Sequence, residues 1–118
     1  MKVAVAKYPI QAPADFAAFA ERQAAVLGAA AAQGARVAVL PEYLSLELAA
    51  TFDASTQADL HASLAAIQRH RDDWLALYAR LAASLDMYVV AGTFLLAQAD
   101  GRYRNRCDVF APQGAHLW

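Results

Sequence analysis

Glu42 is the residue of this sequence best placed to do chemistry. It follows a short apolar run, Val37–Leu40, that stops at Pro41. In an open α/β sheet, functional groups gather beyond the carboxyl ends of the parallel strands. A carboxylate packed there near apolar neighbours loses hydration, which favours its neutral form and suits a general base. The alternative is a strand-ending turn in which Glu42 is exposed or caps the next helix.

Cys107 and the lysines are the other residues whose types suit nucleophilic or oxyanion chemistry. Cys107 alternates with Asn105 and Val109 in the run NRCDVF, which predicts a mid-strand position suited to packing. No basic partner or helix start lies beside it to lower the thiol pKa, so we expect it not to be a nucleophile. Lys2 and Lys7 are the only lysines, and both lie at the first expected strand.

The histidines and arginines form no ligand site in the sequence. No cysteine or second histidine stands at ligand spacing from any histidine, so we expect no metal and no other cofactor. Arg102, Arg104 and Arg106 alternate and therefore share a strand face. One interpretation is a phosphate-binding stripe, but the near-neutral charge balance favours a solvated face or pairing with carboxylates.

Composition indicates a folded chain and excludes some classes of function. Of the 118 residues, 59% are apolar and 18% charged, as in ordinary globular proteins. The formal net charge of −1 lacks the basic excess of nucleic-acid-binding proteins. No window of about 18 residues is both apolar and free of charge, so no membrane span is expected. With one cysteine and no signal-peptide pattern, the simplest compartment is the reducing cytoplasm.

Apolar spacing predicts strands that alternate with helices and then an antiparallel hairpin. Strands are expected at Val3–Tyr8, Arg36–Leu40, Met87–Phe94 and Tyr103–Ala111, with a hairpin turn at Asp100-Gly101 and a fifth strand ending at Trp118. Helices are expected from Ala14 to Gly34, around Ser45–Ala50, along Leu60, Leu64 and Ile67, and from Trp74 to Leu85 after a break or solvated turn at Arg69–Asp73. Ser55 or Thr56 is the expected N-cap of the helix that follows it. The order β-α-β-α-β, followed by antiparallel strands, predicts an α/β fold with a largely parallel sheet.

Four stretches of the sequence stand in an order and spacing that resembles a known family. They are MKVAVAKYPI, GARVAVLPEY, YVVAGTF and DGRYRNRCDVFAPQG, and they span essentially the whole chain. Together they resemble the N-terminal part of the nitrilase superfamily of carbon–nitrogen hydrolases. The most specific pieces are the strand ending in Pro41-Glu42 and the Gly-x-Tyr-x-Asn strand ending in Pro-x-Gly.

The resemblance implies a fold and a reaction. The fold is a four-layer α-β-β-α sandwich, of which residues 1–118 would supply one helix layer and part of both sheets. We expect the chain to be the N-terminal portion of a single domain, truncated at its C-terminal end. The implied reaction hydrolyses non-peptide C–N bonds, with a cysteine thiolate attacking an amide or nitrile, a lysine stabilising the oxyanion and Glu42 as the general base. The family lysine and cysteine have no counterpart before Trp118, so the chain alone is expected to be inactive.

The resemblance also implies a small-molecule amide or nitrile substrate and assembly into a homo-oligomer. Tyr43 follows Glu42 directly and is a candidate to line the substrate pocket, although packing beneath the next helix is the commoner role for such a ring. Asn105 is expected to hold backbone groups near the site rather than to touch substrate.

Two other functions fit parts of the sequence. One is a non-catalytic α/β module, derived from the nitrilase fold, that binds a protein partner; it has no evident use for Glu42. The other is a small nucleotide-binding domain, which would need a glycine-rich phosphate loop that the sequence lacks.

Overall fold

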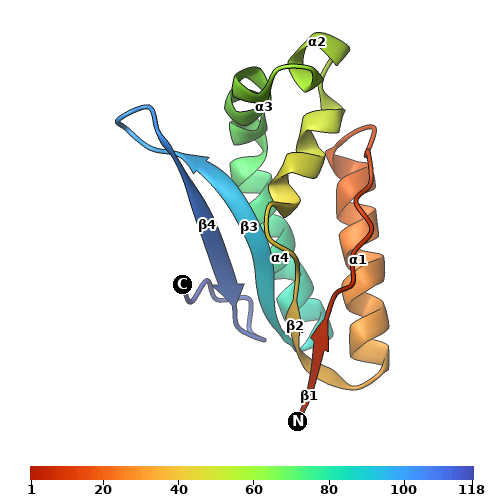
Figure 1. Cartoon of the computed structure of the whole chain (residues 1–118). Helices are drawn as coiled ribbons and strands as arrows, with labels where there is room; N and C mark the ends of the chain where they lie inside the picture. The colour runs from red at the N-terminus through yellow and green to blue at the C-terminus, as the bar shows by residue number, and fades with distance from the viewer.

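The computed structural model describes residues 1–118 as a four-stranded sheet with its helices on one face (Figure 1). The strands are β1 (Lys2–Val5), β2 (Ala35–Val39), β3 (Tyr88–Ala97) and β4 (Tyr103–Phe110). The helices are α1 (Phe16–Ala32), α2 (Ala54–Gln57), α3 (Leu60–Ile67) and α4 (Arg71–Leu85), with 3₁₀ helices η1 (Leu44–Thr51) and η2 (Gln68–His70). The predicted β-α-β-α-β order followed by an antiparallel strand is confirmed.

The strands lie in the sheet in their chain order, β1-β2-β3-β4. The first three are parallel, and β4 runs antiparallel to β3 along most of its length. Because the β3–β4 hairpin extends the same sheet, no strand begins a second one. The expectation that these residues supply part of two sheets is therefore wrong: they form one sheet and one helix layer.

The core lies between the sheet and the two long helices, α1 and α4. Trp74 of α4 stacks on Phe19 of α1, with ring centroids 5.7 Å apart. The same indole meets Tyr78 edge-on at 4.9 Å and Phe94 of β3 at 5.3 Å. Large buried aromatic rings dominate core energetics, so this cluster holds both helices to the sheet.

The first strand is shorter than predicted because Tyr8 turns toward the helices. Its hydroxyl donates to Glu47 Oε1 at 2.9 Å and accepts from Gln23 Nε2 at 2.8 Å. Both partners are buried, so this polar cluster directs the chain out of the sheet after Val5. The prediction that the strand continues to Tyr8 is wrong for this reason.

Two details of the helical segment also differ from the sequence prediction. The expected helix is two helices: Asp53 caps α2, where its carboxylate accepts from Thr56 N at 2.8 Å, and Asp59 caps α3, which carries Leu60, Leu64 and Ile67. Neither Ser55 nor Thr56 is a cap. Aspartate is as favourable as serine at the N-cap, and here an aspartate stands directly before the helix, whereas Ser55 and Thr56 lie inside it. The predicted break near Arg69–Asp73 is the 3₁₀ turn η2, but Arg71 lies inside α4 and is not solvated.

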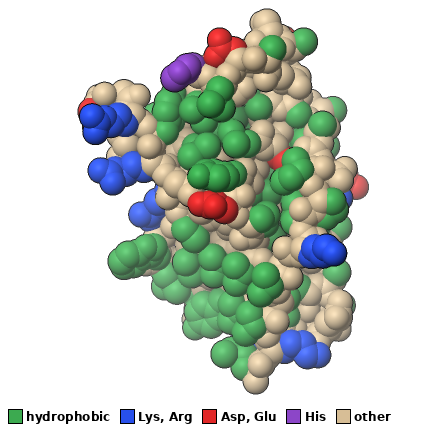
Figure 2. Space-filling view, viewed as in Figure 1, with side chains coloured by type: hydrophobic (Ala, Val, Ile, Leu, Met, Phe, Trp, Pro, Cys, Tyr) green, Lys and Arg blue, Asp and Glu red, His purple; other side chains and the backbone are tan.

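The face of the sheet opposite the helices carries exposed apolar side chains, including Val3, Val5 and Tyr88. Figure 2 shows apolar side chains gathered over this face. The last residues fold back beside β4, where Leu117 N donates to Val109 O at 2.8 Å. They form an isolated bridge between Phe110 and His116 rather than the predicted fifth strand. None of the helices has both the length and the apolar character needed to cross a membrane.

Candidate active site

Glu42 lies just beyond the carboxyl end of β2, as the sequence predicts. Leu40 N still donates to Val90 O of β3 at 3.0 Å, but Pro41 has no N–H with which to continue the ladder. The chain therefore leaves the sheet at Pro41, between two parallel neighbours, where functional groups of α/β sheets gather. Glu42 is exposed, so the shielding by apolar neighbours expected for a general base is not found in this chain.

The carboxylate of Glu42 is held by a side chain from the last strand. Asn105 Nδ2 of β4 donates to Glu42 Oε1 at 2.7 Å, across 63 residues of sequence. The sequence suggested that Asn105 holds backbone groups; it instead holds the candidate base itself. One carboxylate oxygen is thus fixed in direction, and Oε2 is left to accept a proton from another group.

A glycine in β3 makes room for the loop that carries Glu42. Gly92 has a φ of 71°, and a Cβ added to it would lie 2.4 Å from the carbonyl oxygen of Pro41. The pairing of β3 with β4 is irregular here, between Val90 and Thr93. Only glycine combines this conformation with so close an approach of two backbones, so Gly92 is what allows the Glu42 loop to lie on the sheet.

Two hydroxyl groups fix the backbone that follows Glu42. Thr93 Oγ1 accepts from Tyr43 N at 2.6 Å, and Ser45 Oγ accepts from Leu95 N at 3.1 Å. Tyr43 has a left-handed φ of 61°, a conformation that non-glycine residues adopt only when their surroundings impose it. The loop is therefore tied to β3 on both sides of the turn.

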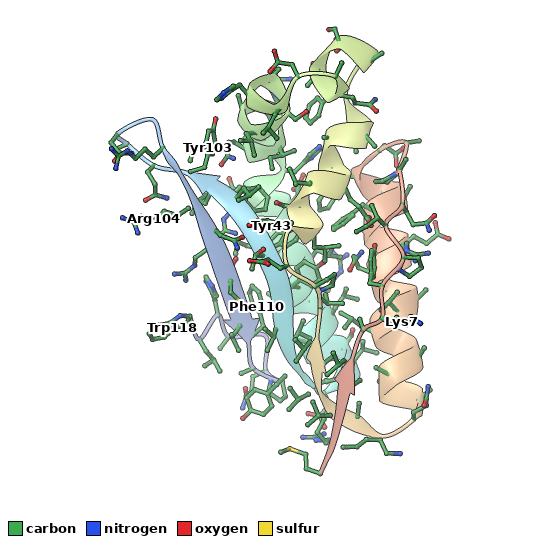
Figure 3. All side chains as sticks on the ribbon, in the orientation of Figure 1. Lys7, Tyr43, Tyr103, Arg104, Phe110 and Trp118 are labelled. Atoms are coloured by element: carbon green, nitrogen blue, oxygen red, sulfur yellow. The ribbon has the colours of Figure 1, made fainter.

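The ring of Tyr43 stands beside Glu42 and is 48% exposed. Figure 3 shows Tyr43 over the middle of the sheet, on the side turned toward the viewer. It does not pack beneath the following helix, which was the alternative to lining a pocket. Its position gives Glu42 an aromatic neighbour that is free to contact another group.

The other candidates for nucleophilic or oxyanion chemistry are not brought to Glu42 in a reactive form. Figure 3 shows Lys7 on the far side of β2, beside α1, and Lys2 lies in β1. Cys107 is half-buried opposite Thr93. Burial raises the pKa of its thiol, the charge of Asp108 adds to the rise, and Arg106 offsets it in part. A thiol with a raised pKa is a poor nucleophile, in agreement with the packing role expected from the sequence.

Of the three alternating arginines, one has a structural partner. Arg106 pairs with Asp108 at 3.2 Å, which bears out the interpretation of carboxylate pairing for this arginine, while Arg102 and Arg104 are exposed. No group of three or more His, Cys, Asp or Glu side chains is placed to hold a metal ion.

The sequence proposed Glu42 and Tyr43 as candidates but did not point to the residues that position them. Gly92 was given no role from the sequence, although a glycine inside a strand pattern is a signal for a bulge or a close backbone approach. The sequence contains no pattern that points to Thr93, because its role is to accept a hydrogen bond from Tyr43 N and this contact depends on the bulge at Gly92.

The comparisons with known proteins concern the family and the fold of the chain. The model of the carbon–nitrogen hydrolase family matches residues 2–117. A solved structure, that of a carbon–nitrogen hydrolase from Helicobacter pylori G27, superimposes with a TM-score of 0.71 at 16% sequence identity. The match covers 97% of this chain and 36% of that protein, so the chain spans about a third of its length. No curated protein sequence gives a significant match.

Proposed function

Because the chain belongs to the carbon–nitrogen hydrolase family, we propose that it carries the general base, Glu42, of an amidase- or nitrilase-type enzyme. The enzyme would act on non-peptide C–N bonds. The observation that supports this most directly is the 2.7 Å hydrogen bond from Asn105, which fixes one oxygen of Glu42 and leaves the other available to a proton donor. The family match does not favour the non-catalytic module or the nucleotide-binding domain.

In the proposed reaction, Glu42 accepts the proton of a cysteine thiol, and the thiolate attacks the carbon of an amide or nitrile. A lysine stabilises the oxyanion that develops, a thioester forms, and ammonia or an amine leaves before water completes the hydrolysis. Cys107 and the two lysines of this chain do not fill these roles. We therefore propose that residues 1–118 are the N-terminal portion of the domain and that they have no hydrolase activity alone.

The surroundings of Glu42 support the finer parts of the proposal. Tyr43 would line the substrate pocket, because its ring is exposed beside the carboxylate. The substrate would be a small amide or nitrile, and the enzyme a cytoplasmic homo-oligomer, as the family resemblance implies. The single cysteine is compatible with that reducing compartment.

The test is to read the coding DNA past codon 118 and to express the protein that it encodes. The release of ammonia by that protein is then measured with a panel of amides, nitriles and carbamoyl compounds. We expect Glu42→Gln to lower kcat/KM by about 10²–10⁴-fold, the usual contribution of a general base. Glu42→Asp should retain part of the rate. The 118-residue chain by itself should release no ammonia from any of these compounds.

Glu21→Gln is the matched control, because it makes the same chemical change at an exposed position of α1. It should leave the rate unchanged. The proposal fails if Glu42→Gln behaves like this control, or if the chain of residues 1–118 is itself a hydrolase.

A further inference from the structure

Glu47 is a buried carboxylate that has no part in the proposed reaction. It is 4% exposed and lies in η1, shortly after Glu42. Its Oε1 accepts from the hydroxyl of Tyr8 at 2.9 Å, and its Oε2 accepts from Gln11 N at 3.0 Å. A buried charge is weak evidence for stability, because apolar residues of similar volume often serve a fold as well or better. The charge is therefore better explained by what its two bonds hold in place.

The bonds of Glu47 end a chain of side-chain hydrogen bonds that crosses the core. Tyr78 of α4 donates to Gln23 Oε1 of α1 at 3.0 Å, and Gln23 Nε2 donates to the hydroxyl of Tyr8 at 2.8 Å. Burial raises the pKa of both tyrosines, so each keeps at neutral pH the proton that it donates. The chain of bonds thus runs in one direction and requires an acceptor at its end, which the carboxylate of Glu47 provides.

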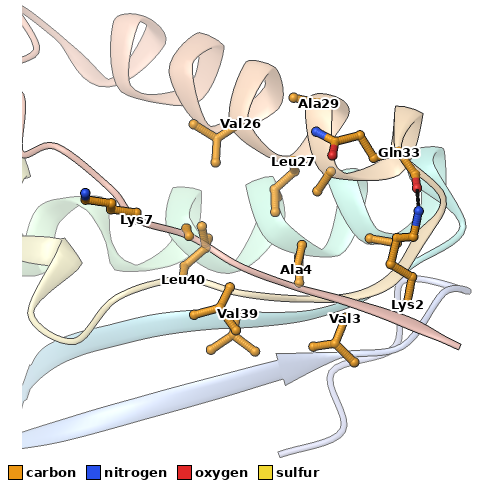
Figure 4. A pocket seen from close by; sticks show the side chains of 15 residues that line it. Lys2, Val3, Ala4, Lys7, Val26, Leu27, Ala29, Gln33, Val39 and Leu40 are labelled. Carbon is orange, nitrogen blue, oxygen red and sulfur yellow. Dashed lines mark hydrogen bonds between the residues drawn. The ribbon is translucent and has the colours of Figure 1, made fainter.

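Tyr8 and Gln11 belong to the segment that follows β1, next to the end of β2. The pairing of β1 with β2 continues to the residue before Lys7. Figure 4 shows Lys7 near Leu40 in the groove between β1 and α1, and both residues line that groove. The segments that follow β1 and β2 therefore leave the sheet together, and the bonds of Glu47 connect them.

The segment that follows β2 is also tied to β3, because β2 lies between β1 and β3 in the sheet. Tyr43 and Ser45 both make hydrogen bonds to β3. No side chain caps the start of η1, so its place depends on these bonds and on those of Glu47. A contact that fixes η1 also fixes the direction in which Glu42, just before it, presents its carboxylate.

We propose that Glu47 is a positioning residue for the general base: it holds η1 so that Glu42 keeps its hydrogen bond to Asn105 and its second oxygen stays available to the thiol. This inference rests on the proposed function. A displacement of about 1 Å at a reacting group can lower a rate by about 10²-fold, so a small shift of η1 is enough. The members of the hydrogen-bond chain bond to one another inside the described fold, whatever covers the outer surface of these elements.

The test compares Tyr8→Phe and Glu47→Gln in the complete protein that the reading frame encodes, with Glu21→Gln as the control on the exposed side of α1. Each of the two variants removes a bond of the chain and nearly keeps the volume of the side chain. We expect kcat to fall by about ten- to hundredfold with KM within about twofold, at a temperature well below unfolding. The double variant should be no slower than the slower single variant, because both changes break one unit. A merely structural role would lower the unfolding temperature and leave kcat unchanged.

An exchange of amide and carboxylate between the two positions tests whether the completeness of the chain matters. With Gln23→Glu and Glu47→Gln together, the new carboxylate accepts from the hydroxyls of Tyr78 and Tyr8, and the new amide donates to Tyr8 and accepts from Gln11 N. This exchange variant reverses one bond and loses none, so kcat should return to within about threefold of the natural value. Gln23→Glu alone places two carboxylates on Tyr8 and should lower kcat as the other single variants do.

Glu42→Gln in the same assay separates this inference from the proposed function. If Glu42→Gln lowers the rate while Glu47→Gln and Tyr8→Phe keep kcat within about twofold, the positioning role alone is overturned. If Glu42→Gln has no effect, or if the protein releases no ammonia, the proposed function fails, and crystal structures still decide whether Glu47 positions Glu42. The 2.7 Å bond from Asn105 to Glu42 should be lost in Glu47→Gln and restored in the exchange variant. A bond that persists in Glu47→Gln would overturn the proposal.

Discussion

Two carboxylates on opposite faces of the same sheet have opposite surroundings. Asp108 of β4 faces the helices and is 1% exposed. It is bonded by both terminal nitrogens of Arg71, at 2.7 and 3.1 Å, and it contacts Arg106 and His116. Glu42 is exposed, and Asn105 is the one side chain that bonds it.

The difference separates a structural charge from one that is free to react. A buried carboxylate must have its oxygens satisfied, and the partners of Asp108 tie α4, β4 and the C-terminal residues together. A carboxylate in that state has no free capacity to take a proton. Glu42 has that capacity, and its loop is held by backbone contacts that do not need its charge. Replacing each carboxylate by the matching amide should therefore give opposite results for stability and activity.

Asp108→Asn should have the largest effect on stability. It leaves the guanidinium of Arg71, whose side chain is 15% exposed, without a compensating charge. Loss of one partner of a buried pair costs about 3 kcal/mol or more in the free energy of unfolding. Urea denaturation followed by circular dichroism measures this, with Asp72→Asn on the exposed side of α4 as the control. A change as small as that of the control would mean that Asp108 is not structural.

Gly92→Ala should have the next largest effect and lower the free energy of unfolding by about 2 kcal/mol. A left-handed conformation costs an alanine about 1–2 kcal/mol, and the added Cβ meets the Pro41 carbonyl. Gly28→Ala is the matched control, since an added Cβ meets nothing within 4 Å inside α1. It should stabilise the chain by about 0.5–1 kcal/mol. Equal effects at the two glycines would show that the Glu42 loop does not depend on Gly92.

The pH dependence of stability should report the ion pairs of Asp108. Burial alone would raise the pKa of Asp108, but the hydrogen bonds and charge of Arg71, with Arg106 and His116, lower it below its ordinary value. The unfolded chain then binds a proton more readily than the folded one, so stability is present above a pH of about 4 and is lost as pH falls through the lowered pKa. Unfolding free energies measured from pH 6 downward should show this loss. The loss should be smaller in Asp108→Asn, and an unchanged slope there would rule out Asp108 as its source.

The elements of this chain could be predicted from its sequence better than the contacts between them. Apolar spacing located both long helices and all four strands, and Pro41-Glu42 marked the end of β2. The contact of Asn105 with Glu42 could not be predicted, because it depends on the register of β4 against β3 and on the bulge at Gly92. The pairing of Arg71 with Asp108 was missed for the same reason: a local pattern of charges suggested a solvated turn, and only the docking of α4 on β4 brings the two together.

Glu42→Gln should have the smallest effect on stability, within about 0.5 kcal/mol, as for an exposed side chain outside the core. The amide oxygen of glutamine can still accept from Asn105 Nδ2, and the loop contacts at Gly92 and Thr93 are untouched. Under the proposed function, the same substitution should remove most of the hydrolase activity. A residue whose loss removes the reaction but not the fold must act in the reaction. If urea denaturation instead shows that Glu42→Gln costs as much as Asp108→Asn, then Glu42 is a second structural charge and any loss of rate would reflect unfolding.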